Sequence, residues 1–396
     1  MKTSWLAVLT LIIAAPAVAR PATVAVAFDR QAIRPVLAEG TADRTAQRVV
    51  TADDPVRIAS ISKLVTTLGV MRLVDQGKLD LDRDVSDYLG YPLRNPAFPN
   101  RPITLRLLLS HQSSLIDGGE LYLVPLGVTL RERLADPRVW DAVHAPGSGW
   151  FHYTNLNFPV VASVVERVTG ERFDVAMSRL VLKPLRLDAC FNWGAGCSAD
   201  AYRRAVVLYR ASGEVARDDL KGSPPACPVY VREGDACRFH PYTLGDNGAL
   251  WSPQGGLRIS MQGLARIGQM LARGGKGFLS GRAFAEMTRP QWRFDGTNGL
   301  GEDGTASGFF CAYGLAVQTI GAGGPGCHDD LFGDGHLRIG HSGDAYGLKA
   351  GLWLDPKTGK GLAFFTTAVP DNEPRGRSAF TKREEDVVRH AARQKD

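Results

Sequence analysis

The chain has 396 residues, of which 44% are hydrophobic and 22% charged, and its 47 basic and 41 acidic side chains give a net charge of +6. This composition excludes a disordered chain, and the lack of a repeating period excludes collagen-like and coiled-coil architectures. The basic residues are spread along the chain and form no cluster, which disfavours a binder of nucleic acid or another anionic polymer.

The first nineteen residues have the pattern of a secretory signal peptide. Lys2 is followed by an apolar stretch from Trp5 to Ala15, and Ala17-Val18-Ala19 is a small-x-small cleavage site. The apolar stretch is too short to cross a bilayer as a helix. We therefore expect residues 1–19 to be removed and the protein to be exported, either periplasmic or secreted, with no membrane-spanning segment.

The predicted elements place strands towards both ends of the chain and helices between them. In chain order they are a strand at 22–28, helices at 60–76, 158–169 and 257–273, two strands at 347–354 and 361–367 joined by a turn at 355–360, and an amphipathic helix at 380–393. We expect an α/β unit of the α+β type, about residues 20–80 and 255–396. A helical unit over about 81–254 is inserted into it, and a pocket is expected at their junction.

Ser60-Ile61-Ser62-Lys63 stands at the start of the first predicted helix. Residues three apart share a helix face, so the Lys63 amine can reach the Ser60 hydroxyl and, when neutral, take its proton. The helix N-terminus adds positive charge where an oxyanion would form. Lys63 is the one lysine that has Ser or Thr three residues before it. The alternative interpretation is a capping serine beside a solvated lysine.

Two further short motifs fit the same chemistry. Tyr153-Thr154-Asn155 precedes the helix at 158–169, and its phenol could carry a proton to a leaving group while the Asn155 amide binds substrate. His341-Ser342-Gly343 precedes the strand at 347–354, where small residues could line a substrate and the backbone N–H groups of Ser60 and Asp344 could form an oxyanion hole. Taken singly, each motif is equally compatible with ordinary structure.

Six cysteines in an exported chain predict disulfides, although fifteen connectivities are possible. Proximity in the sequence favours the local pairs Cys190–Cys197, Cys227–Cys237 and Cys311–Cys327. A zinc site is the alternative, but the sequence has no C-x-x-C pair and no histidine at ligand spacing nearby. We expect three structural bridges and no metal.

In this order the three motifs resemble the penicillin-recognising serine hydrolases, specifically the class C β-lactamase-like family, which has S-x-x-K, Y-x-N and then K-T-G or H-x-G. The resemblance covers most of residues 22–367. It extends to Gly40-Thr41-Ala42-Asp43, Arg57-Ile58-Ala59, residues 73–79, residues 107–111 and Gly255-Gly256-Leu257. It implies one hydrolase domain over 20–396, with an antiparallel sheet flanked by helices, a helical domain beside it and the active site between them.

The resemblance also implies roles for the motif residues. Ser60 is the nucleophile that is acylated by an amide or ester carbonyl, Lys63 and Tyr153 handle its proton, and Asn155 positions the substrate. His341-Ser342-Gly343 lines the strand edge of the site. No cofactor is expected, and the partner is a small-molecule or peptide substrate.

Lys357-Thr358-Gly359 spells the K-T-G motif, but it falls within the predicted turn at 355–360. The family's motif should instead precede the strand at 347–354, where His341 stands. We therefore interpret Lys357 as a solvated turn residue.

Several questions remain open from the sequence. H-x-G is similar to D-alanyl-D-alanine peptidases, D-aminopeptidases and esterases, and a histidine, often neutral at pH 7, binds a carboxylate less well than lysine. Efficient β-lactamase activity is therefore less expected, but peptidase, esterase and β-lactamase all stay possible. Ser114 stands where the pattern around His111 usually has Gly, which puts the local turn in doubt. The alternative function class is a non-catalytic penicillin- or peptidoglycan-binding protein on the same scaffold. The sequence predicts no oligomeric state.

Overall fold

An eight-stranded antiparallel sheet joins the two ends of the chain in the computed structural model, which describes residues 20–393 except 240 and 302. The expected signal peptide therefore lies outside the described residues. In spatial order the strands are β11 (Trp292–Arg293), β13 (Ala312–Tyr313), β14 (Gln318–Ile320), β15 (Arg338–Ala345), β16 (Leu348–Leu354), β17 (Gly361–Thr366), β1 (Thr23–Phe28) and β2 (Ile33–Glu39). The strands predicted at 22–28, 347–354 and 361–367 are confirmed.

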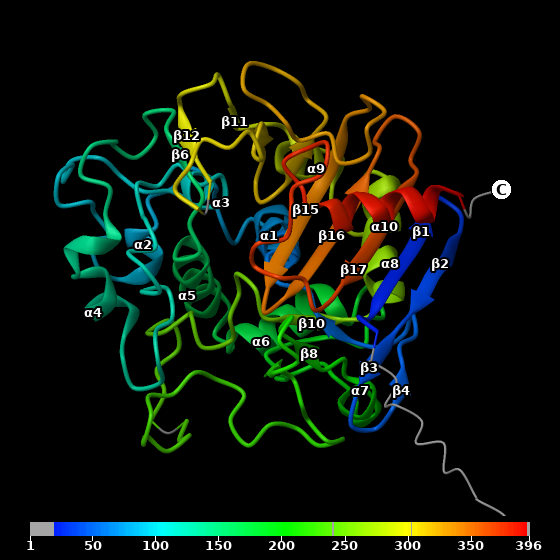
Figure 1. The fold of residues 1–396 in the computed structure, drawn as a ribbon. Helices are drawn as coiled ribbons and strands as arrows, with labels where there is room; N and C mark the ends of the chain where they lie inside the picture. Colours follow the sequence, from blue (N-terminus) through cyan, green and yellow to red (C-terminus); the bar gives the residue numbers. More distant parts are fainter. Residues whose placement is uncertain (1–19, 240, 302, 394–396) are drawn as a thin grey trace, which may run out of the picture.

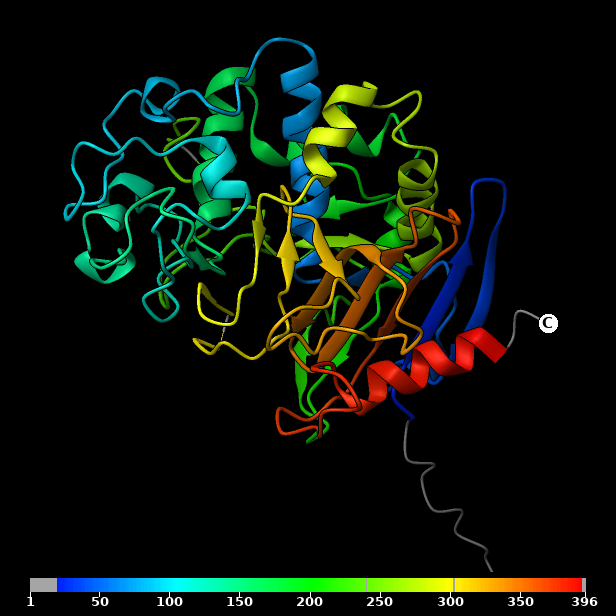
Figure 2. The same cartoon turned by 90° about the horizontal axis from the view of Figure 1, so that it is seen from above.

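Both faces of this sheet are covered, and β1 shows why its sequence is apolar throughout. Successive side chains of a strand point to opposite faces. Val24 and Val26 pack in the core shared with α1 (Ile61–Asp75) and α8 (Met261–Ala272), whereas Ala25 and Ala27 pack on the other face against α10 (Lys382–Arg393). Figure 2 shows the sheet between α10 on one side and α1 and α8 on the other.

The helix that carries Ser60 and Lys63 is enclosed on all sides. α1 contacts β15 and β16 of the sheet as well as α6 (Phe173–Met177) and α9 (Gly281–Thr288), and its polar residues Ser62, Lys63, Thr66 and Thr67 are buried along with its apolar ones. It ends before Gly77, whose φ of +67° is the left-handed conformation that stops a helix. The helix predicted at 60–76 is thus confirmed.

The middle of the chain lies beside the sheet as short helices joined by long loops (Figure 1). It comprises α2 (Ser86–Leu89), α3 (Leu105–Leu109), α4 (Leu130–Leu134), α5 (Asn157–Thr169), α7 (Ala199–Arg204) and the helical turns at Pro137–Val139 and Ser178–Leu182, together with α6. α5 confirms the helix predicted at 158–169 and ends at Gly170, which has a φ of +68°. Apolar residues of this middle part and of α1, α8 and the sheet form one continuous core.

The remaining strands are short and form one three-stranded sheet and three pairs between the loops. β5 (Val56–Arg57), β10 (Leu257–Ile259) and β7 (Cys190–Phe191) form a three-stranded sheet, and β12 (Gly299–Leu300) with β6 (Phe151–His152), β3 (Thr41–Asp43) with β4 (Arg48–Val49), and β8 (Leu208–Tyr209) with β9 (Val215–Arg217) form pairs. The helix predicted over 257–273 was therefore wrong at its beginning. Its first three residues pair with β5 and β7, and Ser260 caps the helix that follows.

The structure pairs the cysteines as their proximity in the sequence suggests: Cys190 with Cys197, Cys227 with Cys237, and Cys311 with Cys327. The Cys311–Cys327 bridge spans β13 and β14 of the main sheet, whereas the other two bridges lie in the middle part of the chain. Within residues 20–393, apart from the two gaps, no helix is long and apolar enough to span a bilayer.

Candidate active site

Ser60 stands at a sharp corner between β5 and α1. Ala59 has a φ of +48°, a left-handed conformation that a residue with a Cβ rarely adopts, and Ser60 itself has helical angles of −63° and −12°. The Ser60 side chain makes no capping hydrogen bond to the helix. Its hydroxyl therefore lies at the helix N-terminus without serving as a cap, unlike the alternative considered from the sequence.

Lys63 is fully buried, and its amine meets three oxygen atoms. Nζ lies 2.9 Å from Ser60 Oγ, 2.7 Å from Asn155 Oδ1 and 3.2 Å from the Gln254 carbonyl oxygen. An ammonium has three N–H donors, so this arrangement satisfies all of them. A solvated lysine is ruled out here, and the amine is in hydrogen-bond contact with the Ser60 hydroxyl.

Asn155 is held by Asp117. The Asp117 carboxylate accepts hydrogen bonds from the Asn155 and Leu156 N–H groups, at 3.1 and 2.9 Å, and from Asn155 Nδ2 at 2.9 Å. Burial raises the pKa of Asp117, and these hydrogen bonds partly oppose the rise. Nothing in the sequence around Asp117 indicated this role.

Tyr153 lies beside the same amine within an aromatic cluster. Lys63 Nζ is 4.7 Å from the centre of the Tyr153 ring, which stacks on Phe310 and His111. The Thr154 N–H donates to His111 Nδ1 at 3.0 Å. Burial and the charge of Lys63 lower the pKa of His111 well below its usual value. A neutral His111 therefore fixes the backbone of the Y-x-N motif, which agrees with a structural role.

The turn around His111 forms although Ser114 stands where the family pattern has Gly. Ser114 has a φ of +63°, the left-handed conformation that glycine adopts readily, and its Oγ accepts a hydrogen bond from Asn95 Nδ2. Ser114 thus adopts the backbone conformation that a glycine would have at this position.

The strand β15 brings Ser342 and Gly343 to Ser60. β15 pairs with β14 only up to Gly340, and beyond that residue it pairs with β16 alone. Its other edge is therefore open beside the start of α1. A Cβ on Gly343 would lie 2.4 Å from the Ile58 carbonyl oxygen, so only glycine permits this approach of strand and helix.

His341 is the motif residue whose side chain lines neither of the two cavities at Ser60. Its ring is fully buried, with Nδ1 2.6 Å from the Ser342 carbonyl oxygen and Nε2 2.7 Å from the Tyr313 hydroxyl. Since a carbonyl only accepts, Nδ1 carries the proton and Nε2 accepts from Tyr313. Burial, with the charge of Lys63, lowers the pKa of His341 to about 3. The expectation that His341 lines the site is therefore corrected: its side chain is buried and hydrogen-bonds to Tyr313.

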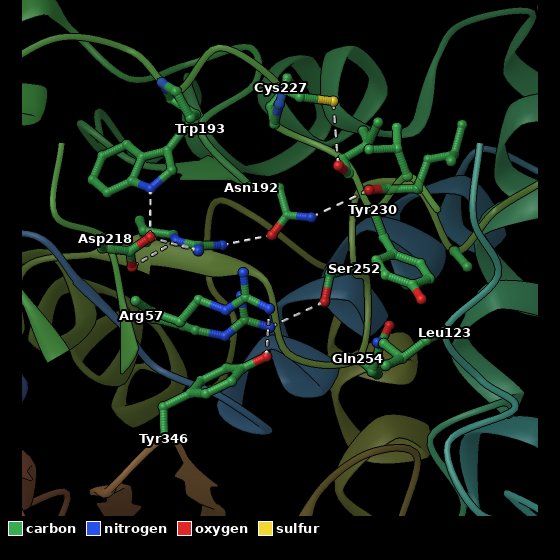
Figure 3. Close-up of a pocket in the computed structure, with 18 of the residues that line it drawn as sticks. Arg57, Leu123, Asn192, Trp193, Asp218, Cys227, Tyr230, Ser252, Gln254 and Tyr346 are labelled. Carbon is green, nitrogen blue, oxygen red and sulfur yellow. Dashed lines mark hydrogen bonds and ion pairs between the residues drawn. The ribbon is translucent and has the colours of Figure 1, made fainter. Parts of the chain in front are cut away.

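Two cavities meet at Ser60. One, of about 350 Å³, is lined by Tyr153, Ser342, Gly343 and Asp344. The other, of about 280 Å³, is lined by Asn155 and Gln254 and adjoins a larger cavity of about 530 Å³, with which it shares Arg57, Leu123, Gln254 and Tyr346. Figure 3 shows the larger cavity. Ser60 is thus reachable from two sides.

Lys357 is exposed in the turn between β16 and β17, where its N–H donates to Asp355 Oδ1. The sequence interpretation of this K-T-G as a turn is confirmed. Among the residues that the structure describes, no three His, Cys, Asp or Glu side chains gather as they would around a metal ion.

Comparison with known proteins places this chain in a family. Residues 13–385 match the Beta-lactamase family. The chain is 30% identical over 298 residues to esterase EstB of Burkholderia gladioli, covering 68% of this chain and 73% of the esterase. It is 30% identical over 192 residues to the D-alanyl-D-alanine-carboxypeptidase/endopeptidase AmpH of Escherichia coli K12, covering 47% and 48% of the two chains.

The fold is similar to that of a solved amidase structure. The D-amino acid amidase of Ochrobactrum anthropi SV3 superimposes with a TM-score of 0.65 at 19% identity, over 95% of this chain and 93% of the amidase. The chain belongs to the β-lactamase family of serine hydrolases. The resemblance read from the three motifs is confirmed, as is the expected fold.

Proposed function

We propose that this protein hydrolyses esters through an acyl-enzyme on Ser60. The observation that carries the proposal is the contact of 2.9 Å between Lys63 Nζ and Ser60 Oγ, made by a fully buried lysine at the helix N-terminus. A serine hydroxyl becomes a strong nucleophile only when a base stands beside it.

The partners of Lys63 allow it to serve as this base. When the amine is neutral, two N–H groups donate to Asn155 Oδ1 and the Gln254 carbonyl, and the lone pair is directed at the remaining partner, Ser60 Oγ. Asn155 thereby orients the amine. As Ser60 Oγ attacks the substrate carbonyl carbon, its proton passes to Lys63.

The oxyanion formed by this attack would meet two backbone N–H groups. The Ser342 N–H points to the open edge of β15, at 3.4 Å from Gln318 Oε1, and N–H directions alternate along a strand, so the Asp344 N–H points to the same edge. Ser60 is the N-cap residue directly before α1. The backbone N–H groups of Ser60 and Asp344 are our candidates for the oxyanion hole.

Tyr153 is the candidate that returns the proton. Its phenol gives a proton to the leaving alkoxide as the carbonyl–oxygen bond breaks, and the proton on Lys63 replaces it. In the second half, water attacks the acyl-enzyme, its proton passes to the same pair, and Ser60 Oγ leaves as the hydroxyl. The two halves together add one water across one ester bond.

The charges around the leaving group favour an ester over a β-lactam or a D-alanyl peptide. Tyr153 lines only the cavity of about 350 Å³, so the leaving group enters there. That cavity is lined by Asp303, Asp344, Asp371, Glu373 and Glu384 and by two cations, Lys349 and Arg375. The two cations already pair with Asp344 and Asp303, so neither is left for a substrate carboxylate, and Glu373 pairs with Arg383. Penicillins and D-alanyl-D-alanine peptides both carry a carboxylate on the leaving side, and the buried His341 cannot bind it. An alcohol leaving group avoids this repulsion.

The test compares kcat/KM on p-nitrophenyl butyrate, nitrocefin and a D-alanyl-D-alanine peptide for the wild type and for Ser60→Ala. We expect the ester to be preferred by at least about 100-fold and its turnover to vanish in Ser60→Ala but not in Ser212→Ala, an exposed serine used as the control. Preference for nitrocefin or the peptide would contradict the ester assignment. Ester turnover that survives Ser60→Ala would contradict the nucleophile.

We also propose that the protein acts outside the cytoplasm. Three disulfides support export, because such bonds persist in oxidising compartments. N-terminal sequencing of the protein from a cell fraction outside the cytoplasm should begin at Arg20. A chain that starts at Met1 would contradict the signal peptide.

A further inference from the structure

The cavity of about 530 Å³ is lined by a cluster of arginines and aromatic rings, and it adjoins the cavity at Ser60 that Tyr153 does not line. Trp193, Tyr230 and Tyr346 line it together with Arg57, Arg217 and Arg258. Because the leaving group is expected on the Tyr153 side, the acyl part of the substrate would extend into this cavity. Its charges therefore bear on which acyl group is accepted.

Two of the three arginines already have partners. Arg258 makes a two-pronged ion pair with Asp218, whose carboxylate also accepts from Trp193 Nε1, and both residues are buried. Arg217 Nη2 donates to the Tyr346 hydroxyl at 3.2 Å. The positive charge of Arg258 is thus neutralised within the wall of the cavity.

Arg57 differs from its neighbours. The structure gives its guanidinium one hydrogen bond, from Nη2 to Ser252 Oγ at 3.3 Å, and among the described residues no carboxylate lies within 4 Å of it. Figure 3 shows Arg57 between Tyr346 and Ser252, within the group of side chains that line the cavity. It also lines the smaller cavity that contains Ser60.

The pKa values of Arg57 and Tyr346 are consistent with an excess of positive charge in this cavity. Burial and the nearby Arg258 lower the pKa of Arg57 to about 10, so it remains protonated at neutral pH. Burial alone would raise the pKa of the Tyr346 phenol, yet Arg57 and Arg217 reverse the effect and lower it. The lowered pKa of Tyr346 follows from the positive charge of the neighbouring arginines, whereas that of Arg57 follows mainly from burial.

The acidic residues of the two cavities do not remove this excess. Asp219 lies 3.9 Å from Lys221, and Asp344 pairs with Lys349 across the β15–β16 ladder. Glu120 is exposed, and Arg210 on the same cavity offsets its charge. An incoming anion is thus the natural partner of Arg57.

We propose that Arg57 is a specificity-determining residue that binds a carboxylate at the far end of the substrate's acyl group, so that the enzyme prefers half-esters of dicarboxylic acids. This inference rests on the proposed ester hydrolysis at Ser60. A guanidinium suits the role because it can hold a carboxylate with two parallel hydrogen bonds.

The spacing along the chain limits the length of the acyl group. Arg57 is three residues before Ser60, so their Cα atoms lie at most about 11 Å apart. An acyl chain of about six carbons can therefore place its ester carbonyl at Ser60 and its carboxylate at Arg57. We choose adipic acid derivatives as probes on this basis.

Binding is tested apart from turnover, using Ser60→Ala and a ligand-observed NMR titration. The probes are monomethyl adipate, which is an anion, and dimethyl adipate, which is neutral. We expect the anion to bind at least tenfold more tightly. The preference should disappear in Ser60→Ala/Arg57→Met, be partly kept in Ser60→Ala/Arg57→Lys, and be unchanged in Ser60→Ala/Arg266→Met, where Arg266 is an exposed arginine on α8. Equal binding of the two probes, or a preference that survives Arg57→Met, would overturn the proposal.

A second measurement separates this inference from the ester proposal. The kcat/KM of the enzyme with an intact Ser60 is compared on the mono-p-nitrophenyl ester of adipic acid and on p-nitrophenyl methyl adipate. We expect a ratio of ten or more, falling to near one in Arg57→Met. Hydrolysis of both esters at equal rates would overturn the role of Arg57 alone. Absence of hydrolysis would contradict the proposed function, while the binding titration still decides on Arg57. If Arg57→Met fails to fold, the Arg57→Lys variant and the ratio in the unsubstituted enzyme decide the question.

Discussion

Asp117 accepts hydrogen bonds from both the backbone N–H and the side-chain amide of Asn155, at 3.1 and 2.9 Å. Because a carboxylate only accepts, Nδ2 of Asn155 must face Asp117, and Oδ1 is left to face Lys63 at 2.7 Å. One carboxylate outside the three motifs thus sets the orientation of the group that holds the candidate base.

Removing this carboxylate should therefore reduce activity. For Asp117→Ala we expect kcat/KM on p-nitrophenyl butyrate to fall about 10- to 100-fold, the equivalent of ~1.5–3 kcal/mol for hydrogen bonds to a charged group. Most of the loss should be in kcat, because the amine and not the substrate is misplaced. Asp235→Ala, at an exposed position, is the control. A loss confined to KM would argue against this positioning role.

Substitution of Lys63, in S-x-x-K, should greatly reduce activity, whereas substitution of Lys357, in the K-T-G of the turn, should not. Lys63→Met removes the candidate base, and we expect kcat/KM to fall by at least about 1000-fold. Lys357→Met changes only an exposed side chain, so its kcat/KM should stay within twofold of the wild type. Thermal unfolding of both variants checks that they fold. Substantial activity in Lys63→Met would require another base.

Gly343 should not tolerate a methyl group. In Gly343→Ala the new Cβ would meet the Ile58 carbonyl at 2.4 Å, and both groups belong to backbone that is fixed by pairing or by α1. We expect a loss of about 1–3 kcal/mol in the free energy of unfolding, as for other overpacked sites, and at least a tenfold loss of kcat/KM. Gly281, at the start of α9, has open space around it, so Gly281→Ala should cost nothing. Equal effects of the two substitutions would disprove the close contact.

The lowered pKa of the buried His341 predicts how the free energy of unfolding depends on pH. Its pKa is about 3 in the folded protein and about 6.5 in the unfolded chain, so between these values the unfolded chain binds a proton that the folded protein does not. Stability attributable to His341 is therefore full above pH 6.5 and is lost as the pH falls. The free energy of unfolding should drop by about 2 kcal/mol from this residue between pH 7 and pH 5.

Urea unfolding at the two pH values measures this loss. His341→Gln should show a drop that is smaller by about 2 kcal/mol than that of the wild type. His336→Gln is the control, because the His336 side chain is 61% exposed. A His341→Gln variant with the wild-type pH dependence would contradict a neutral, buried His341.

The sequence predicted the parts of this protein that local patterns specify. The α1 helix, the contact of Ser60 with Lys63 and the strands β16 and β17 follow from residue spacing and from the turn at 355–360. β2 was missed because it is an edge strand: its residues are largely exposed and include Pro35, so it lacks the alternation that reveals a half-buried strand. β10 was predicted as the beginning of the helix that follows it, since the pattern of three residues, two of them apolar, does not distinguish a strand from a helix.

The rest of the site depends on contacts between residues distant in the chain. Asp117, Tyr313 and Gln254 have no recognisable motif, and each acts on a motif residue from 28 to 191 positions away. His341 shows the converse, because its place in H-x-G suggests contact with substrate, whereas the bond to Tyr313 turns its ring into the core. A motif fixes which residues are near one another but not which side chain faces the cavity.

The most direct test of the account is the intact mass of the protein after treatment with a fluorophosphonate, which phosphonylates the hydroxyl of an activated serine with loss of fluoride. We predict one adduct on the wild type, none on Ser60→Ala, and labelling slowed by at least about 1000-fold in Lys63→Met. An adduct that persists on Ser60→Ala, or a wild type that takes up no reagent, would contradict the claim that Ser60, activated by Lys63, is the nucleophile.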